Sequence, residues 1–462
     1  MSRVDDNTLL LKSVYVKRRN IDAVTVLTCY LVLLMAIPSS LVVGSFGAVG
    51  QPAALFAALL LGWYLLARQH PEFHLDRERQ PIRVSAGLFG CAILAAYVSA
   101  NSTAMPALQI NGADRGLILA AGWLGVLLLA ADGIDRADRL ATLMRRIVLG
   151  ATAMAVLGMI EFVTGIDVTK YVTIPGLTVH QQVTELMSRA GLVRVNATAS
   201  QPLEFAAVLA MSLPLAIHQA RYACRSRRFR RWLQVALITG AIPMTVSRSA
   251  ILGLAIIGVV LIPTWRRQER RRAYLLVLLV PIALWLASPS LLNSFAATFG
   301  QLGADSSSAS RASALSSAVP LIAQHPWFGQ GFQTFFPQKF FYVDNQFLTS
   351  LIETGIVGLS ALLALFITGW FTAWNARLAA ADIRDKDLAQ CLIAGLAVAA
   401  LNFGTFDVLS FSIAPGLYFL LLGCIGAQWR LTRAEQRVKT ASSHSDSQLA
   451  YSAKDNLMET GQ

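Results

Sequence analysis

The segment HPWFGQGFQTFFPQKFFYVDNQFLTSLIETGIVG, residues 325–358, is rich in glycine, proline, aromatic and polar residues and lies between two long apolar stretches. A single arginine, Arg311, lies upstream of it in the Ser/Ala-rich run 303–317. Most of the remaining chain consists of apolar runs long enough to form helices across a bilayer. We therefore expect these helices to hold the segment against the outer face of a membrane.

Composition supports a membrane protein. The chain has 462 residues, of which 55% are hydrophobic and only 14% are charged, and its mean hydropathy is +0.54. A soluble protein of this size needs more charge on its surface. The formal net charge of +13 is compatible with nucleic-acid binding. The basic residues, however, form short clusters between apolar runs, which indicates membrane topology and no nucleic-acid partner.

The expected fold is all-α and polytopic, with about twelve transmembrane helices in a domain over residues 21–428. A large extracytoplasmic loop, 291–345, separates the ninth and tenth spans. Residue 21 begins a retained first helix, because no short apolar region with a small-residue cleavage site precedes it. The predicted spans are 21–43, 51–67, 84–100, 115–131, 147–165, 202–220, 232–247, 250–264, 273–290, 346–374, 389–404 and 411–428.

The distribution of basic residues predicts the orientation. With the N-terminus (1–20) inside, the inner segments contain 32 of the 39 lysines and arginines. Such a bias is typical of cytoplasmic loops. Both termini are therefore expected in the cytoplasm, and the polar tail 429–462 is expected to be disordered. The seven basic residues left on the outer side are Arg115, Lys170, Arg189, Arg194, Arg248, Arg311 and Lys339.

Neither a metal site nor a cofactor site is predicted. The five cysteines are scattered, without CxxC or paired spacing. The chain contains no GxxxxGK[ST] and no GxGxxG motif, which argues against nucleotide binding. Its one DxD, Asp385-Lys386-Asp387, falls on the inner side beside Arg384, and we interpret it as a charged loop.

Three arginines stand apart from the basic clusters. Arg248 lies between two apolar stretches, and Arg311 is expected in the first turn of a helix that ends near Pro320. Arg194 shortly precedes the sixth span. A guanidinium beside a helix N-terminus suits a phosphate. The alternatives are snorkelling to lipid headgroups for Arg248, a solvated loop for Arg311, and a salt bridge with Glu204 for Arg194.

Asp344 and Asn345 immediately precede the tenth span. A carboxylate at a water-accessible membrane edge can act as a general base, and Asp344 is our candidate; the alternative is a helix N-cap. We assign Asn345 and Glu353 to substrate binding. For Glu353 the reason is that an ionisable residue in or near the membrane is functional by default. Gly355 and Gly358 should let neighbouring helices pack closely.

Four segments, in this order, resemble the O-antigen ligase/O-antigen polymerase superfamily of bacterial membrane glycosyltransferases. They span residues 194–358, and the first five spans are similar to the family only in being hydrophobic. The HPWFGQG segment on its own indicates a tight turn with interfacial aromatics. The four are Arg194 with NATASQP (196–202), TVSRSA (245–250), Arg311 upstream of HPWFGQG (325–331), and DN-x9-GIVG (344–358), which is similar to the ligase pattern H-[NSQ]-x9-G-x-x-[GTY].

The resemblance implies a metal- and nucleotide-independent, inverting glycosyl transfer on the outer face of the plasma membrane. The donor is an undecaprenyl-diphosphate-linked glycan, and the acceptor is lipid A core, another carrier-linked unit or a protein. Outer arginines matching Arg248 and Arg311 handle the diphosphate, and we add Arg194 as a third. Asp344 would deprotonate the acceptor hydroxyl. It occupies the place of the ligase histidine, which favours a polymerase, or a ligase with a different acceptor, over a lipopolysaccharide ligase.

A polytopic transporter or flippase is the alternative function. Glu161, Glu353 and Asp407 are the residues that it would use. Against it, the charged features concentrate on one face rather than at mid-bilayer, and no paired broken helices are evident in the sequence.

Overall fold

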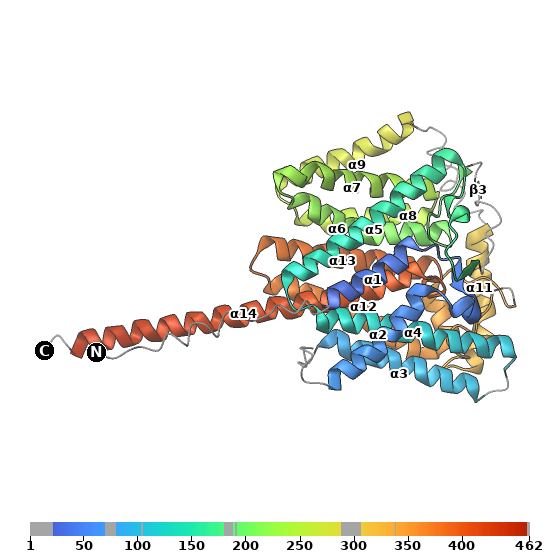
Figure 1. Ribbon diagram of the computed structural model, residues 1–462, viewed down its shortest axis with the longest axis horizontal. Coiled ribbons are helices and arrows are strands. Elements are labelled where there is room, and N and C mark those ends of the chain that lie inside the picture. The colour runs from blue at the N-terminus through green and yellow to red at the C-terminus, as the bar shows by residue number, and fades with distance from the viewer. Residues whose placement is uncertain are drawn as a thin grey trace.

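The computed structural model describes residues 22–69, 80–102, 105–179, 188–189, 192–287, 306–337 and 339–459. Most of them are helical, as predicted, and a helix overlaps each of the twelve expected spans (Figure 1). These helices are α1 (Ala23–Ala36), α2 (Pro52–Gln69), α3 (Pro81–Asn101), α4 (Ala107–Gly133), α5 (Ala137–Thr164), α6 (Pro202–Arg221), α7 (Arg225–Ala241), α8 (Arg248–Leu261), α9 (Arg267–Ala287), α12 (Gln346–Ala379), α13 (Ile383–Thr405) and α14 (Ile413–Glu459). A further helix, α11 (Ser306–Gln324), lies between α9 and α12 in the sequence.

Short elements occupy the connections. The 3₁₀ helices are η3 (Gly44–Val49), η4 (Val168–Tyr171), η5 (Pro243–Thr245), η6 (Ile262–Thr264) and η7 (Val408–Ser410). The strands β1 (Leu41–Val43) and β2 (Leu177–Val179) pair antiparallel, with Val42 opposite Thr178. The strands β3 (Ser188–Arg189) and β4 (Leu192–Val193) form a second antiparallel pair.

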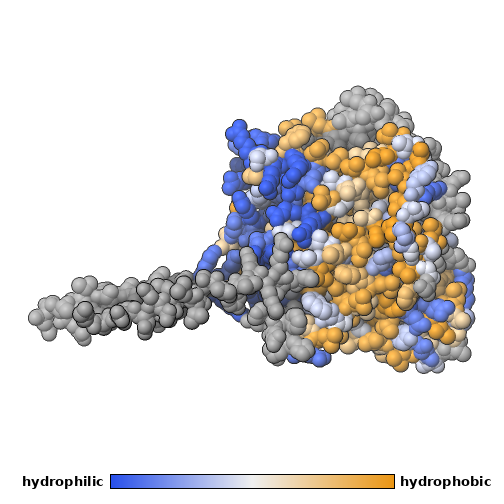
Figure 2. All heavy atoms as spheres, in the orientation of Figure 1, coloured by the Kyte–Doolittle hydropathy of each residue, from blue (hydrophilic) through white to orange (hydrophobic). Residues whose placement is uncertain are grey.

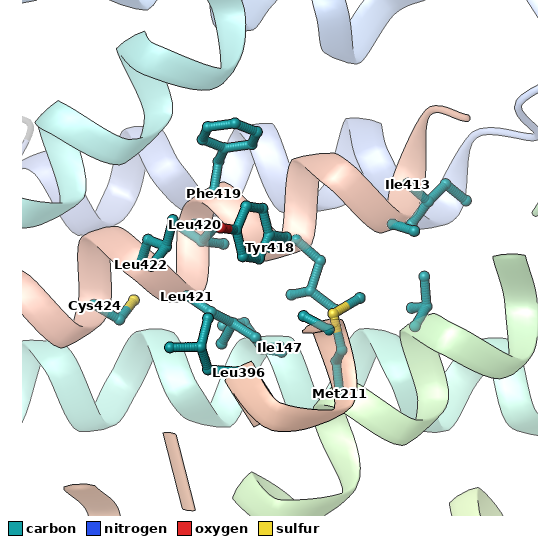
Figure 3. Packing of buried hydrophobic residues seen from close by; sticks show 14 of the residues in the cluster. Ile147, Met211, Leu396, Ile413, Tyr418, Phe419, Leu420, Leu421, Leu422 and Cys424 are labelled. Atoms are coloured by element: carbon teal, nitrogen blue, oxygen red, sulfur yellow. The ribbon is translucent and has the colours of Figure 1, made fainter. Parts of the chain in front are cut away.

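The first half of α14 is the centre of the bundle. It packs against α1, α3, α4, α5, α6, α12 and α13, and the run Ile413–Trp429 is buried throughout. Figure 3 shows Tyr418 and Phe419 among side chains from neighbouring helices. A helix that is apolar on every side is expected to be enclosed by others.

The bundle has two polar ends, which we name from the elements found there. The tail end is where α14 leaves the bundle, and the loop end is where α11 lies (Figure 1). On the face drawn in Figure 2, a broad hydrophobic band separates the hydrophilic tail end from a mixed margin at the loop end. By length and composition, seven described helices can cross a membrane, namely α2, α3, α4, α5, α6, α12 and α13. Together with shorter apolar helices at Ala23–Ala36 and Arg248–Thr264, they identify an integral membrane protein.

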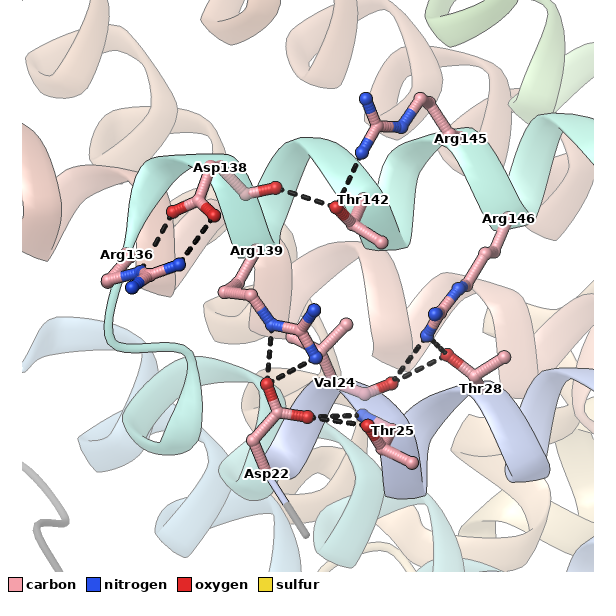
Figure 4. Close-up of polar contacts among 10 residues, drawn as sticks. All are labelled: Asp22, Val24, Thr25, Thr28, Arg136, Asp138, Arg139, Thr142, Arg145 and Arg146. Atoms are coloured by element: carbon pink, nitrogen blue, oxygen red, sulfur yellow. Dashed lines mark hydrogen bonds and ion pairs between the residues drawn. The ribbon is translucent and has the colours of Figure 1, made fainter. Parts of the chain in front are cut away.

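Segments that the charge count placed on one side lie together at the tail end. Arg83 pairs with Asp132 at 2.7 Å, and Arg139 pairs with Asp22 (Figure 4). Arg221 pairs with both Asp387 and Glu269. These ion pairs join inner segments that are far apart in the sequence, and they account for the clustering of opposite charges there.

Three expectations about local structure were wrong. The stretch 429–459, expected to be disordered, continues α14, because it contains neither glycine nor proline to end the helix. The DxD stretch 385–387 lies in the first turns of α13 and not in a loop. The helix α11 runs past Pro320 to Gln324. The N-terminal segment 1–20 and the loop residues 291–305 lie outside the described residues.

Candidate active site

The segment that follows Arg194 is a buried, tightly bonded loop. The Glu161 carboxylate accepts hydrogen bonds from the backbone N–H groups of Asn196 (3.3 Å) and Ala197 (2.8 Å). The Thr198 hydroxyl donates to the carbonyl of Met35 at 2.8 Å. Ala197 has a φ of +48°, which an alanine adopts only when its surroundings impose it. This loop therefore holds the backbone next to Arg194 in a fixed position.

Arg194 and Arg248 are brought to one turn of the backbone. The Arg194 Nε atom donates to the carbonyl of Thr245 at 2.9 Å. Val246 follows with a φ of +47°, a strained conformation for a β-branched residue. Ser247 is the N-cap residue of α8, and Arg248 is the first residue of that helix. Two of the predicted arginines thus lie at the N-terminal end of α8, where the helix dipole favours anions.

Glu204, the alternative partner of Arg194, has another structural role. Its side chain is fully buried. One carboxylate oxygen accepts hydrogen bonds of 2.5–3.2 Å from the backbone N–H groups of Ser412, Ile413 and Ala414, where α14 begins. The other oxygen accepts from the N–H and hydroxyl of Ser200. Glu204 therefore joins the Arg194 loop to the central helix.

The break in α12 is filled by the backbone of the 325–331 segment. Gly355 has φ +66° and ψ −166°, so the helix is interrupted there. The N–H groups of Gln330 and Gly331 donate to the carbonyls of Ile352 (3.1 Å) and Glu353 (2.8 Å). In return, the two N–H groups after Gly355 donate to carbonyls within the segment. We call this reciprocal bonding the clasp.

Gly355 was expected to admit a neighbouring helix, and the structure corrects this. A Cβ atom at Gly355 would overlap the backbone of Trp327, so the close neighbour is a loop. The structural role predicted for HPWFGQG agrees with the clasp. Glu353, assigned to substrate binding, also supports the loop, because its Oε1 accepts from the N–H of Phe335 at 3.2 Å.

Asn345, rather than Asp344, caps α12. The Asn345 Oδ1 atom accepts from the N–H groups of Phe347 (2.9 Å) and Leu348 (3.3 Å). The N-cap interpretation of Asp344 is therefore wrong by one residue, and the Asn345 amide oxygen, which we assigned to substrate, is used in the cap. The Asp344 side chain is exposed at this helix start.

Asp407 lies close enough to Asp344 for the two charges to interact. Burial raises the pKa of Asp407 to about 6, and the like charge of Asp344 adds to the increase. Gln346 connects the two regions, since its Oε1 accepts from the N–H of Leu409 at 2.7 Å. Two carboxyl groups, those of Asp344 and Asp407, thus lie in the same region at the loop end.

The raised pKa of Asp407 predicts how the unfolding free energy of the protein changes with pH. The folded protein holds this proton up to about pH 6, and the unfolded chain releases it near pH 4, so stability falls as the pH rises between these values. Asp407→Asn removes the effect. Relative to the wild type, the variant should therefore gain about 1–2 kcal/mol of unfolding free energy between pH 4 and pH 7, measured by thermal unfolding in detergent. Asp138→Asn, an exposed change at the tail end, should show no such rise; a flat difference for Asp407→Asn contradicts the prediction.

Helix packing brings the two halves of the candidate site to the same end. Gln390, early in α13, donates to the carbonyl of Val260, late in α8, at 2.9 Å. The two helices are therefore antiparallel. Arg248, the first residue of α8, lies level with the end of α13 at Thr405, two residues before Asp407.

The third arginine, Arg311, lies in α11, in its second turn and not in its first. Its side chain is outside the described part of the chain. The helix packs through Ala314 and Ala318 in one apolar cluster with Ile352 and with Val343, the residue before Asp344. Position 311 precedes these alanines by three and seven residues, a spacing that places it on the same helix face.

Backbone strain marks the same segments. Among the described residues, the non-glycine residues with positive φ are Ala197, Val246 and Gln333. Each lies in or next to a segment that carries the family resemblance. Strained backbone tends to persist where function requires a fixed geometry.

A second polar cluster, at the tail end, has the donor set of a metal site. Ligand atoms of His218, Asp387 and Cys391 lie within 4.8 Å of one another. Asp387 already binds His218 at 2.7 Å and also pairs with Arg221. The Arg221 guanidinium would repel an added cation, so we interpret this cluster as a polar contact that holds α6 and α13 together.

Sequence reasoning missed the structural carboxylates of the site. Glu161 was assigned only to the transporter alternative, and Glu204 only to a salt bridge. Both bind backbone N–H groups of segments that are distant in sequence. An acidic residue within an apolar run was the available signal in the sequence, but this signal does not indicate which groups the carboxylate binds.

One comparison with known proteins, the family model, agrees with the resemblance. Residues 233–363 match the model of the O-antigen ligase family. No curated protein matches the chain. A solved structure described as "Structural coordination of polymerization and crosslinking by a peptidoglycan synthase complex" is similar with a TM-score of 0.40 and 16% identity, over 76% of this chain and 97% of the other. The matched residues contain α8, α11, the clasp and Asp344, so this part of the chain is similar to the O-antigen ligase family.

Proposed function

We propose that the protein is a membrane glycosyltransferase that transfers or polymerises a glycan carried on a lipid diphosphate. The observation that supports this most directly is the meeting of Arg194 and Arg248 at one strained turn, at the same end of the bundle as Asp344. The reaction site is the loop end, which we place on the outer face of the bacterial plasma membrane. The twelve helices that overlap the predicted spans would cross the bilayer, with both termini in the cytoplasm.

The arginines supply the positive charge that the reaction needs. When the glycosidic bond breaks, the electron pair stays on the carrier diphosphate, whose negative charge increases. Guanidinium groups are permanently charged and bind phosphate oxygens in pairs, which suits a leaving group of this kind. Arg248 and Arg311 bind the diphosphate in this proposal, and Arg194, fixed to Thr245, lies beside them. Because Arg194 adjoins a tightly hydrogen-bonded loop and Arg248 begins a helix, their charge is in place before reaction.

Asp344 is the general base of the proposal. Its carboxylate accepts the proton of the acceptor hydroxyl as that oxygen attacks the anomeric carbon from the side opposite the diphosphate. One C–O bond forms while the other breaks, and the anomeric centre is inverted. Asp407, whose pKa the charge of Asp344 also raises, carries a proton up to about pH 6, mainly because it is buried. The acceptor is a glycan, a lipid or a protein.

Transfer from purified carrier-linked glycan tests the proposal with Arg248→Ala, Arg311→Ala and Asp344→Asn. Each change should lower the turnover rate by about 100-fold, the usual effect of removing one group that stabilises transition-state charge or transfers a proton. Arg136→Ala is the matched control, because that arginine is exposed at the tail end and pairs with Asp138. Near-normal turnover of all three variants, at normal protein levels, contradicts the proposal.

The product distinguishes the remaining functions. A ladder of glycan lengths indicates a polymerase, and a preassembled chain moved to a new acceptor indicates a ligase. Movement of the lipid-linked glycan across proteoliposomes, with no bond made or broken, supports the transporter or flippase instead. The break in α12 is a feature of many transporters, but here the clasp satisfies the backbone groups at the break.

A further inference from the structure

Arg115 lies near the start of α4, at the loop end, and neither the family resemblance nor the proposed mechanism gives it a role. The residue is only partly exposed. Its Nε atom is buried without a hydrogen-bond partner among the described residues. Its neighbour in sequence, Asp114, instead accepts a hydrogen bond from the hydroxyl of Tyr97 at 2.8 Å. The described part of the chain therefore provides no counter-charge for this guanidinium.

The surroundings of Arg115 place it beside the 325–335 region. One turn of α4 lies flat against this segment, because Cβ atoms at Gly112 and Gly116 would overlap Gln333 and Phe332. Gln333 in turn donates to the carbonyl of Leu409 at 3.0 Å, in the η7 connection that follows Asp407. Arg115 thus adjoins the candidate active site from the side of α4.

This position differs from that of the Arg194–Arg248 turn. Arg194 is fixed to Thr245, between α7 and α8. Arg115 is fixed through α4, which packs on α2, α3, α14 and η3. The two groups approach the loop end from different helices, and no described contact joins them.

A buried cation without a counter-charge lowers stability, because the desolvation cost of the ion is not offset by an ion pair. The tail-end arginines of this protein show the usual solution, with carboxylates at 2.7 Å. An anionic ligand would provide the missing partner at Arg115. The part of the residue that remains exposed leaves access for such a ligand.

We propose that Arg115 binds a phosphate group of a lipid-linked substrate at a subsite separate from the Arg194–Arg248 turn. The inference rests on the proposed function, in which a polymerase uses two carrier-linked molecules, each with its own diphosphate. One belongs to the donor and one to the acceptor, and the chemistry recognised is the same in both. Arg115 would hold one diphosphate while the Arg194–Arg248 turn holds the other.

Binding of undecaprenyl diphosphate to the full chain in nanodiscs tests the subsite without requiring turnover. The wild type should bind two equivalents. Arg115→Met and Arg248→Ala should each lose one, with the dissociation constant of that equivalent raised about 10-fold or more, and the double variant should lose both. Arg115→Lys should restore part of the lost affinity, because it keeps the charge without the planar fork.

Lys339→Met is the matched control. Lys339 is exposed at the same end and donates to the Gln109 side chain at 3.3 Å, so the substitution removes the same formal charge without emptying a buried position. It should leave both equivalents unchanged. Wild-type binding of both equivalents by Arg115→Met overturns this inference and leaves the proposed function standing. Near-normal transfer by Arg248→Ala, Arg311→Ala and Asp344→Asn contradicts the proposed function, whatever Arg115→Met does.

Thermal unfolding without ligand separates a binding residue from a structural one. Arg115→Met keeps the length and apolar stem of the side chain and removes the unpaired charge. We expect the variant to unfold at a higher temperature than the wild type, because the desolvation cost disappears. A lower unfolding temperature indicates a structural arginine and overturns the inference.

Kinetics then assign the subsite to one substrate. With donor and acceptor varied separately, Arg115→Lys should raise KM about 10-fold or more for one of them, leaving kcat and the other KM close to the wild-type values. An increase for the acceptor identifies the acceptor diphosphate as the ligand, and an increase for the donor identifies the donor diphosphate. Unchanged KM for both overturns the inference.

Discussion

Alanine at Gly355 should prevent most of the protein from reaching its native fold. The glycine combines φ +66° with ψ −166°, a backbone region that is nearly closed to other residues. The added Cβ atom would also overlap the backbone of Trp327 in the clasp, which cannot move aside as a flexible side chain can. Together these effects should cost about 4 kcal/mol or more. Fluorescence size-exclusion profiles and unfolding temperatures in detergent measure the loss.

Gly62→Ala in α2 is the control for this experiment. A Cβ atom at Gly62 has no neighbour within 4 Å, and alanine is a better helix former than glycine by up to about 1 kcal/mol. Gly62→Ala should therefore unfold at or above the wild-type temperature. If Gly355→Ala behaves in the same way, the clasp does not support the fold.

Replacing Glu204 with alanine should be almost as damaging. The substitution removes the acceptor for three backbone N–H groups at the start of α14 and for Ser200. A buried donor left without a partner costs about 1–3 kcal/mol, and here several donors lose their partner at once. The unfolding temperature should fall sharply. Transfer activity of the remaining folded protein should fall too, since Glu204 connects the Arg194 loop to the central helix.

Asp138→Ala provides the comparison. It too removes a carboxylate, but this carboxylate pairs with Arg136, and both side chains are more than 60% exposed. Surface pairs of this kind contribute less than about 1 kcal/mol, so the unfolding temperature should hardly change. A similar small change for Glu204→Ala contradicts a capping role for that residue.

The helices and the site segments were predictable for different reasons. Apolar runs of about 17–25 residues are constrained by bilayer thickness, so each expected span overlaps a helix even though the boundaries differ. Arg194 and Arg248 were predicted as candidates because an isolated charge among apolar membrane helices is energetically costly, which indicates a functional role. The position of Arg311 in a helix followed from the serines before it.

The remaining features depend on contacts between segments distant in sequence. Nothing local in Glu204 indicates that it caps a helix more than 200 residues later. The pattern around Gly355 is helical on both sides, so the break is invisible until the 325–331 segment is placed against it. Asp344 and Asn345 are both good N-caps, and the choice between them depends on a one-residue difference in where the helix starts.

The central position of α14 has a consequence for biogenesis. It follows in the chain every helix against which it packs, so the ribosome produces it after them. Until α14 is inserted, the central position among the earlier helices is empty, and Glu204 lacks the backbone N–H groups that it caps in the folded protein. The proposed site at the loop end is therefore incomplete until α14 is made, and a nascent chain stalled before residue 413 should be inactive and open to membrane quality-control proteases.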